Sequence, residues 1–390
     1  MVSFHLHQYS TAPSFLQAIL KTFVDGFFEA GSKDFVSNLD KTDYYVSTSR
    51  PGRAIPGSVP YCFQKEAAGL PKKVLVGIDG GGTHSTAVAA YPDGRIAAVA
   101  KGGGANFHNI GVEAVRRHLE EMVDALCQQC GCEAEEICVG MSALDAPADE
   151  ATHELFAAGT LGRGHLDLQS DVYIALMGFT LGKPGVIVIC GTGSMLLMLD
   201  HEGRQHAAGG WGYLLGDAGS GYTLAREGLL AVIDASEGTG ADTPLVEDAL
   251  RFFGAKTPRG LIDRVYAPET TPDKLAGFAR CVLTRAEGGD DVALGILERN
   301  MARLARSAAQ LIAADPQAGR VGLYGGIFVH SPLARTLFAK TLHSLAPDAV
   351  ICPLEYPPEL GALIHLLRKR GMLTADVLAR MQSTYKEMQK

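Results

Sequence analysis

The sequence predicts an α/β fold in which one strand–turn–strand unit occurs twice. The first unit opens with V-L-V-G-I-D-G-G-G-T, residues 74–83, where an apolar strand is followed by an acid, three glycines and a threonine. In the second unit, the apolar strand Val186–Cys190 is followed by G-T-G-S, residues 191–194. From Lys73 onward, predicted strands alternate with predicted helices, as in α/β proteins. These observations predict a duplicated architecture with two glycine turns facing one cleft.

The repeat continues beyond the glycine turns. After each turn comes a second strand, a turn that contains an acid, a glycine and an arginine, and a third strand. In the first unit the strands are Ser85–Ala90 and Ile96–Ala100, and in the second they are Met195–Leu199 and Gln205–Ala208. The alternative is a coincidence of two ordinary hairpins.

The glycine turns are candidate phosphate-binding sites. Glycine has no Cβ, so bare backbone N–H groups can approach an anion closely. Asp79, at the end of the first strand, lies where a carboxylate could hold a hydrated Mg²⁺. The alternative is a tight hairpin whose glycines serve geometry alone. The candidate residues are Gly80, Gly81, Gly82 and Thr83 in the first turn, and Gly191, Thr192, Gly193 and Ser194 in the second.

Composition limits the function classes. The chain has 390 residues, enough for two domains, and its 47% hydrophobic and 20% charged content is ordinary for a globular protein. A net charge of −8 argues against a nucleic-acid partner, which favours a basic surface. No apolar run is long enough for a membrane span, and eight scattered cysteines fit a reduced compartment. We therefore expect a cytoplasmic protein, and a homodimer is compatible with the sequence.

We expect four parts along the chain. Residues 1–72 form an N-terminal extension, with an amphipathic helix at Pro13–Ala30 and a proline-punctuated loop or linker after it. A start site assigned too far upstream would also give such a segment. The remaining parts are an N-terminal lobe at 73–182, a C-terminal lobe at 183–372 with a helical insert at 223–314, and a charged surface helix at 373–390.

Further helices and strands follow from apolar periodicity and turn residues. The helix Val112–Gln129 carries a single apolar face, formed by Val115, Leu119, Met122, Val123 and Leu126. The other expected helices are Asp149–Ala158, Val172–Thr180, one from Pro332 and one from about Leu360; the other expected strands are Ile137–Met141, Leu166–Gln169 and Val321–Tyr324.

Four familiar motifs are rejected. The segment 178–184 is one residue short of a P-loop and has Pro184 where a Ser or Thr must bind Mg²⁺. The glycines at 80–82 lead into a strand, whereas a dinucleotide fingerprint opens a helix. His201, Glu202 and His206 fall on a turn with the wrong spacing for a zinc protease. The cysteines at 127, 130 and 132 have no second Cys or His pair for a metal cluster.

Two acids are candidates for a general base. Asp171 and Asp145 each follow a predicted strand and precede a predicted helix, at the sheet edge where α/β enzymes bind ligands. A base there could accept a proton from a hydroxyl that attacks a phosphate. Either acid could instead be a helix N-cap. The residues alone do not choose between them.

Five ordered motifs resemble the BadF/BadG/BcrA/BcrD ATPase family, which includes N-acetylglucosamine kinases and belongs to the sugar kinase/Hsc70/actin superfamily. The resemblance covers about residues 73–370 and implies two ribonuclease-H-like (actin-like ATPase) domains around an ATP cleft. The motifs are G-I-D-G-G-G-T, S-D-V-Y-I-A-L, I-V-I-C-G-T-G-S, G-G-W-G-Y-L-L-G-D-A-G-S-G-Y and L-Y-G-G-I-F.

The resemblance also implies roles for individual residues. It makes Asp171 the catalytic base, assigns the two glycine turns to the phosphates of ATP, and assigns Gly325 and Gly326 to the adenosine. The residues that it places at the sugar are Asn106, Gly210, Trp211, Gly212 and Asp217. Two positions depart from the family pattern: Ala218 replaces the glutamate of G-D-E-G-S, and His108 replaces a tryptophan of the animal members.

We therefore expect an ATP-dependent kinase of an amino sugar, of the N-acetylglucosamine or glucosamine type, that uses ATP and Mg²⁺. Two alternatives stay open at this point. One is an ATPase that activates a partner protein, and the other is a non-catalytic sugar or nucleotide sensor.

Overall fold

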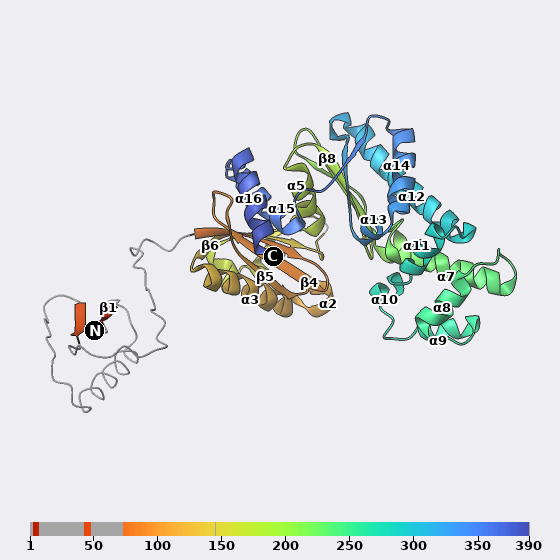
Figure 1. The fold of residues 1–390 in the computed structure, drawn as a ribbon, viewed down its shortest axis with the longest axis horizontal. Helices are drawn as coiled ribbons and strands as arrows, with labels where there is room; N and C mark the ends of the chain where they lie inside the picture. The colour runs from red at the N-terminus through yellow and green to blue at the C-terminus, as the bar shows by residue number, and fades with distance from the viewer. Residues whose placement is uncertain (1–2, 8–42, 48–72, 145, 390) are drawn as a thin grey trace, which may run out of the picture. The chain divides into compact units, whose positions relative to one another are not determined.

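The computed structural model describes residues 3–7, 43–47, 73–144 and 146–389 (Figure 1). The chain divides into two compact units between residues 68 and 69. In the first unit, β1 (Ser3–His7) and β2 (Asp43–Ser47) form an antiparallel pair. The strand β2 lies in the segment that its prolines predict as a loop, so that part of the prediction is wrong. The predicted helix Pro13–Ala30 and the candidate base Asp145 lie outside the described residues.

The second unit contains two five-stranded sheets with equivalent strand orders, β5-β4-β3-β6-β7 and β10-β9-β8-β11-β12. In each sheet the first three strands in sequence pair antiparallel and the last two pair parallel. This repeat confirms the predicted duplicated α/β architecture. The strands are β3 (Lys73–Gly80), β4 (His84–Ala90), β5 (Ile96–Gly103), β6 (Glu133–Met141), β7 (His165–Ser170), β8 (Gly185–Cys190), β9 (Ser194–Leu199), β10 (Gln205–Gly209), β11 (Arg320–Tyr324) and β12 (Val350–Cys352).

The helices connect these strands and cover the sheets. In the first half they are α2 (Phe107–Ile110), α3 (Val112–Cys130), α4 (Glu150–Phe156) and α5 (Asp171–Thr180). In the second half they are α6 (Gly212–Leu215), α7 (Gly221–Glu237), α8 (Leu245–Phe253), α9 (Leu261–Val265), α10 (Pro272–Ala276), α11 (Ala279–Glu287), α12 (Asp291–Ala314), α13 (Gly326–His330), α14 (Pro332–Leu345), α15 (Pro358–Lys369) and α16 (Ala375–Met388).

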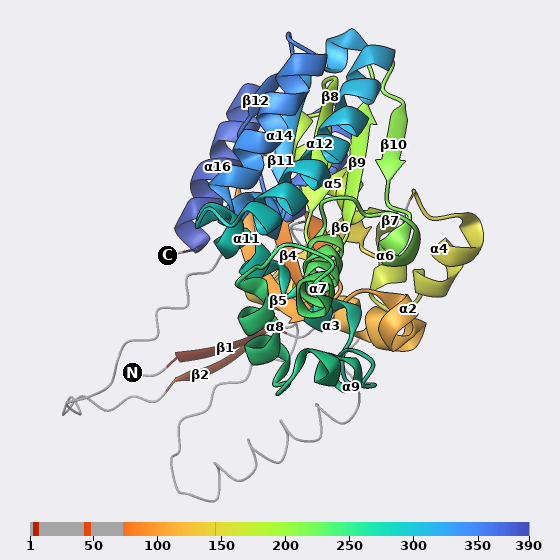
Figure 2. The same cartoon turned by 90° about the vertical axis from the view of Figure 1, so that its right-hand side faces the viewer.

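Both central strands are buried on both faces, which explains their continuous apolar sequences. In β3, Val74 and Val76 pack toward α3, whereas Leu75 packs toward α5 and α15. In β8, Val186 packs toward α12, whereas Ile187 packs toward α5 and α15. Two helices, α5 and α15, therefore fill the space between the sheets (Figure 1). The helix α12 covers the other face of β8, β9 and β10 (Figure 2).

The helix α3 forms as its apolar periodicity predicts. It ends at Cys130, one residue beyond the prediction, because Gly131 adopts a left-handed conformation with φ 62° that terminates the helix. Its five buried side chains are the predicted ones: Val115, Leu119, Met122, Val123 and Leu126. The prediction of one amphipathic face is confirmed.

The C-terminal helix α16 is not purely a surface helix. Its sequence is charged, but Met381 and Tyr385 are buried, and the Thr384 hydroxyl accepts a hydrogen bond from the Ile96 backbone N–H at 3.0 Å. The helix therefore docks on the first sheet. A charged surface helix forms as predicted, and two large side chains at four-residue spacing bury one edge of it.

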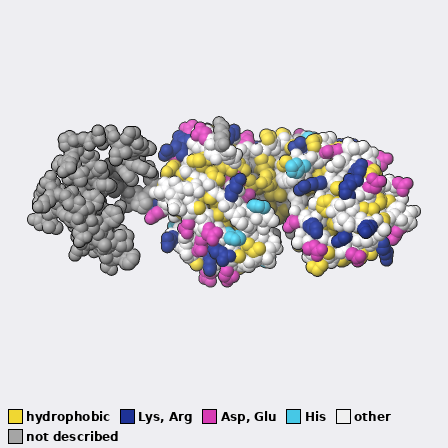
Figure 3. Space-filling view, turned by 60° about the horizontal axis from the view of Figure 1, so that its bottom comes forward, with side chains coloured by type: hydrophobic (Ala, Val, Ile, Leu, Met, Phe, Trp, Pro, Cys, Tyr) yellow, Lys and Arg dark blue, Asp and Glu magenta, His cyan; other side chains and the backbone are white. Residues whose placement is uncertain are grey.

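Across residues 73–144 and 146–389, no helix combines the length and apolar character that crossing a membrane requires. On the face drawn in Figure 3, acidic and basic side chains are interspersed among hydrophobic ones.

Candidate active site

The fold brings Asp79 and Asp171 together at the carboxyl ends of β3 and β7, the two strands that flank β6. Asp79 pairs with Gly140 in the parallel β3–β6 ladder. A Cβ added to Gly140 would lie 3.2 Å from the Asp171 Cα, so α5 begins directly above this strand. Glycine at 140 permits that close approach. The two acids, 92 positions apart in the sequence, therefore lie on either side of one glycine.

The surroundings of Asp79 are acidic and largely buried. Burial, followed by the charges of Glu359 and Asp171, raises the pKa of Asp79 from 3.8 to about 7. Burial, followed by the charges of Asp79, Glu359 and Asp171, raises the pKa of Tyr324 from 10.0 to about 12. Three carboxyl groups and one phenol thus share this region, which we call the acidic centre. A cation would relieve the repulsion among these acids.

The first glycine turn is held against the neighbouring backbone. The Ala105 N–H donates to the Gly81 carbonyl at 2.9 Å, and the Ser142 N–H donates to the Gly80 carbonyl at 3.0 Å. A Cβ on Gly80 would lie 2.7 Å from the Gly140 carbonyl oxygen, so this position requires glycine. Gly82 and Thr83 are exposed, which leaves the tip of the turn accessible to a ligand.

The second glycine turn is tied to the start of α7. The Gly221 N–H donates to the Gly191 carbonyl at 2.7 Å, and the Tyr222 N–H donates to the Thr192 carbonyl at 3.1 Å. Gly325, with φ 100°, precedes α13, and a Cβ there would lie 2.4 Å from the Cys190 carbonyl oxygen. The predicted adenosine residue therefore borders the predicted phosphate turn. Through Tyr324, this region also adjoins the acidic centre.

Asp171 is not a helix N-cap. Ser170 has that role, because its hydroxyl accepts a hydrogen bond from the Tyr173 N–H at 3.1 Å. Asp171 is the first helical residue, and its carboxylate accepts from the Val172 N–H at 2.7 Å. The capping alternative for Asp171 is therefore wrong.

The glycine-dense segment after β10 folds back onto the second glycine turn. The Gly210 N–H donates to the Ser194 carbonyl at 3.1 Å, and the Ser194 hydroxyl donates to the Ala218 carbonyl at 2.8 Å. The Asp217 carboxylate accepts backbone hydrogen bonds from Ser194 and Gly212, while burial raises its pKa. Hydrogen bonds thus hold Asp217 and Ala218 against the second glycine turn.

The other predicted sugar residues differ in exposure. Asp217 is only 7% exposed and holds an unusual φ of 58°, and its Oδ1 has no partner among the described residues. A buried carboxylate oxygen without a donor is suited to accept a hydrogen bond from a substrate hydroxyl. Trp211, in contrast, is 73% exposed. Asn106 is partly exposed and caps α2, where its side chain accepts from the His108 N–H at 3.1 Å.

Asn300 on α12 holds this segment in place. The buried Asn300 side chain accepts from the Gly219 N–H at 2.9 Å and donates to a Glu227 oxygen at 3.0 Å. We expect Asn300→Ala to lower the free energy of unfolding by about 2 kcal/mol, because it leaves buried polar groups unpaired. If Asp217 binds a substrate, as predicted, the same variant should raise KM for that substrate. Urea unfolding and steady-state kinetics would measure both effects.

Arg299→Ala is the matched control, because Arg299 is an exposed neighbour that contacts the same Glu227 at 3.4 Å. It should change stability by less than about 0.5 kcal/mol. Equal effects of the two variants would contradict a special role for Asn300.

The acidic centre fits a magnesium ion that is bound together with nucleotide phosphates. Within the described part of the chain, no three His, Cys, Asp or Glu side chains form a group that could hold a metal ion alone. Magnesium usually retains several waters and is bound through one or two carboxylates plus phosphate oxygens. The half-buried Asp79, surrounded by other acids, has the donor chemistry for such an ion.

Asp79 should destabilise the nucleotide-free and magnesium-free protein at neutral and higher pH. Its folded-state pKa of about 7 exceeds the unfolded value near 3.8, so the folded state binds the proton more tightly. Stability is then lost as pH rises from about 4 to about 7. We expect Asp79→Asn to raise the free energy of unfolding at about pH 8, by at most about 4 kcal/mol, and to have less effect near about pH 4.

Urea unfolding of the apo-protein at these two pH values would measure the change. Asp93→Asn is a control with the opposite sign, since hydrogen bonds and charges from Arg95 lower the Asp93 pKa. A lower free energy of unfolding for Asp79→Asn than for the unmodified protein at the higher pH would contradict the expected destabilisation by Asp79.

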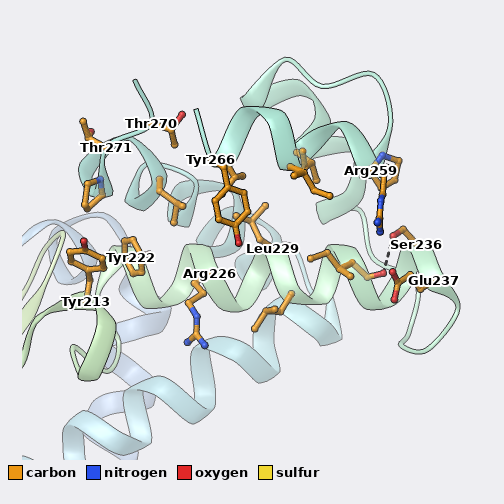
Figure 4. A pocket seen from close by; sticks show the side chains of 18 residues that line it. Tyr213, Tyr222, Arg226, Leu229, Ser236, Glu237, Arg259, Tyr266, Thr270 and Thr271 are labelled. Carbon is orange, nitrogen blue, oxygen red and sulfur yellow. Dashed lines mark hydrogen bonds between the residues drawn. The ribbon is translucent and has the colours of Figure 1, made fainter. Parts of the chain in front are cut away.

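A pocket of about 520 Å³ lies between α7 and the segment that holds α9 and α10. Figure 4 shows Tyr213 and Tyr222 at one end and Arg259 and Glu237 at the other. None of the predicted catalytic, nucleotide or sugar residues lines it. Its end at Tyr213 and Tyr222 nevertheless adjoins the candidate site, because Tyr213 directly follows Gly212 and the Tyr222 N–H donates to the Thr192 carbonyl.

Comparison with known proteins now decides the family. The model of the BadF/BadG/BcrA/BcrD ATPase family matches residues 76–364.

The chain belongs to the BadF/BadG/BcrA/BcrD ATPase family.

Three relatives of this chain are named as amino-sugar kinases. It is 27% identical to an N-acetyl-D-glucosamine kinase of Dictyostelium discoideum, over 77% of this chain and 100% of that protein. It is 28% identical to an N-acetylmuramic acid/N-acetylglucosamine kinase of Clostridium acetobutylicum, over 75% of this chain and 97% of that protein. A glucosamine kinase of Vibrio cholerae is 30% identical over 58% of this chain and 76% of that protein.

A solved structure supports the same fold. A provisionally assigned N-acetylglucosamine kinase from Chromobacterium violaceum has a TM-score of 0.60 and 28% identity, covering 75% of this chain and 98% of that one. A glucokinase from Streptomyces griseus, at 15% identity and a TM-score of 0.50, shows the fold alone. The predicted actin-like ATPase architecture of this BadF/BadG/BcrA/BcrD ATPase is confirmed.

Sequence reasoning missed several residues of the site. Tyr324 directly precedes the predicted Gly325, so its place at a strand end was a usable signal. Glu359 follows Pro358 in the first turn of α15, but its sequence context is that of an ordinary helix start. The Tyr385 hydroxyl, near the end of the chain, donates a hydrogen bond to Glu359 Oε1, and nothing local in the sequence indicates this contact.

Proposed function

We propose that this chain is an ATP-dependent amino-sugar kinase that transfers the terminal phosphoryl group of ATP to a sugar hydroxyl. The observation that carries the proposal is the pair of acids, Asp79 and Asp171, beside Gly140 and next to the glycine turns. The family and its relatives support it, because the relatives reported above are amino-sugar kinases. The sugar is of the N-acetylglucosamine or glucosamine type. Because the reaction consumes ATP, we place it in the cytoplasm.

Asp171 is proposed as the general base. Its carboxylate accepts the proton of the sugar hydroxyl as that oxygen attacks the terminal phosphorus, and ADP leaves with the electrons of the broken P–O bond. The peptide N–H groups of Gly80–Thr83 and Gly191–Ser194 bind the phosphates, and Gly325 and Gly326 border the adenosine. Asn106, Gly210, Trp211, Gly212 and Asp217 contact the sugar.

Asp79 is proposed to hold Mg²⁺ through bound water. When bound, this ion neutralises charge on the phosphates of ATP. The burial of Asp79 and the neighbouring negative charges support this assignment, because an isolated group of acids is unfavourable without a cation.

The two halves of the duplicated fold are proposed to act as lobes, at residues 73–182 and 183–372. Closing the lobes around both substrates would exclude water, which limits hydrolysis of ATP. Helices at 223–314 would enlarge the second lobe.

A coupled ADP-release assay with a panel of hexoses and hexosamines tests the proposal. We expect ADP release to depend on an amino sugar and to be weak with glucose or without sugar. ATP turnover unaffected by any sugar would replace the proposal with a partner-activating ATPase. Sugar binding without ADP formation, at saturating Mg²⁺ and ATP, would replace it with a sensor, to which the Ala218 departure would then be relevant.

A further inference from the structure

Glu359 is a buried acid that the proposed mechanism does not use. It lies in the first turn of α15 and is 7% exposed. The helix packs tightly on β3, since a Cβ on Gly77 would lie 2.4 Å from the Glu359 carbonyl oxygen. Alternate residues of a strand share one face, so Asp79 lies on the same face of β3 as Gly77, the face on which α15 packs. Glu359 is therefore part of the acidic centre.

A tyrosine from the end of the chain holds this carboxylate. The Tyr385 hydroxyl on α16 donates a short hydrogen bond to Glu359 Oε1. Tyr385 is itself only 6% exposed. The helix α16 is fixed to the first sheet by the Thr384–Ile96 hydrogen bond and by Arg380, which donates to the Asp93 carbonyl at 3.0 Å. It lies beyond the residues 76–364 that the family model matches.

The charges around Glu359 indicate that its carboxylate does more than hold α16 in place. No lysine, arginine or histidine pairs with it in the described part of the chain, and its bonded partner is a neutral phenol. The other groups of the acidic centre, Asp79, Asp171 and Tyr324, are acids and a phenol, so none of them brings a positive charge. Burying a carboxylate in such surroundings costs several kcal/mol unless a cation compensates it. The nucleotide-bound magnesium of the proposed mechanism would supply that compensation.

We propose that Glu359 is a further acidic residue of the nucleotide–magnesium site, and that Tyr385 is the positioning residue that holds it there. This inference rests on the proposed function. The C-terminal helix α16 is then part of the site, because its Tyr385 hydroxyl positions the Glu359 carboxylate. Glu359 acts on the hydrated cation by charge, and Tyr385 acts only through Glu359.

The test compares binding of ADP with and without a divalent cation in the full-length protein. Glu359→Gln keeps the size and an acceptor oxygen but removes the charge. We expect it to weaken Mn²⁺ binding to the protein–ADP complex by on the order of tenfold, measured by electron paramagnetic resonance. In excess EDTA, the same variant should bind ADP equally or more tightly, because removing Glu359 removes repulsion of the phosphates.

Two further variants separate positioning from folding. Tyr385→Phe removes only the hydroxyl and should weaken Mn²⁺ binding by about threefold, less than Glu359→Gln does, because the carboxylate keeps its charge and loses only the bond that positions it. Thr384→Val removes the neighbouring contact to Ile96 and should leave Mn²⁺ binding within about twofold. The thermal unfolding midpoint of each variant shows whether the variant is folded at the temperature of the binding measurement.

Two results would overturn the inference. One is Mn²⁺ binding in Glu359→Gln that equals the unmodified protein. The other is a loss of ADP binding that is the same with and without metal, which would indicate a structural role. Since these measurements need no sugar, a failure of the ADP-release screen would reject the kinase proposal separately.

Discussion

Replacing Asp171 with asparagine should lower kcat for sugar phosphorylation by about 10²- to 10⁴-fold, the usual contribution of a general base. Asparagine retains the size of the side chain and can still accept the hydrogen bond from the Val172 N–H. It cannot accept the proton of the sugar hydroxyl at neutral pH. The fold and ATP binding should therefore persist. The ADP-release assay and nucleotide titration would measure the two properties separately.

Asp149→Asn is the control for this prediction. Asp149 is also an acid before a helix of the first half, and its carboxylate accepts from the Thr152 N–H at 2.8 Å as the N-cap of α4. Because asparagine caps helices about as well as aspartate does, its kcat should not change. Near-normal turnover in Asp171→Asn would reject Asp171 as the base.

Gly361→Ala should lower the free energy of unfolding by about 3 kcal/mol or more, because it overpacks a backbone contact that cannot move aside. A Cβ at Gly361 would lie 1.9 Å from the Ile174 carbonyl oxygen and 2.8 Å from the Gly178 backbone nitrogen. These atoms belong to α5, so the two helices between the sheets would have to separate. Those helices carry Asp171 and Glu359, and activity should fall as well.

Gly295→Ala is the matched helix variant. Gly295 lies inside α12, and the single contact of an added Cβ is the flexible end of Arg299, at 3.3 Å. Alanine there should be neutral or stabilising by up to about 1 kcal/mol, since it favours the helix. Urea unfolding measures both variants. Similar stabilities for Gly361→Ala and Gly295→Ala would show that the α5–α15 contact can relax.

The fold could be predicted because its signals are local. The apolar strands β3 and β8 and the amphipathic face of α3 are readable in a few residues each. The short helix α13 was missed because it begins at Gly325, whose φ of 100° serves a close contact with Cys190 that no local pattern indicates. The short strand β12 depends on pairing with β11, which is a tertiary contact.

The candidate site was only partly predictable, for the same reason. Asp79 lies at the end of a strand and Asp171 directly follows one, both at the expected edge of the sheet, so the sequence indicated both residues. Glu359 joins them because α15 packs on β3, and Tyr385 joins because α16 folds back against the first sheet. Both contacts connect segments far apart in the sequence, and only the folded chain shows them.

The two sheets have equivalent strand orders, but the connection between the third and fourth strands differs in length between the two halves. In the first half, the connection from the third to the fourth strand holds α2 and α3; in the second, it holds α6 through α12. Asp217 and Asn300 lie on this longer connection, whereas both glycine turns lie outside it. Substitutions or insertions in this one connection can therefore alter Asp217 and the contacts that support it, while the sequences of both glycine turns stay the same.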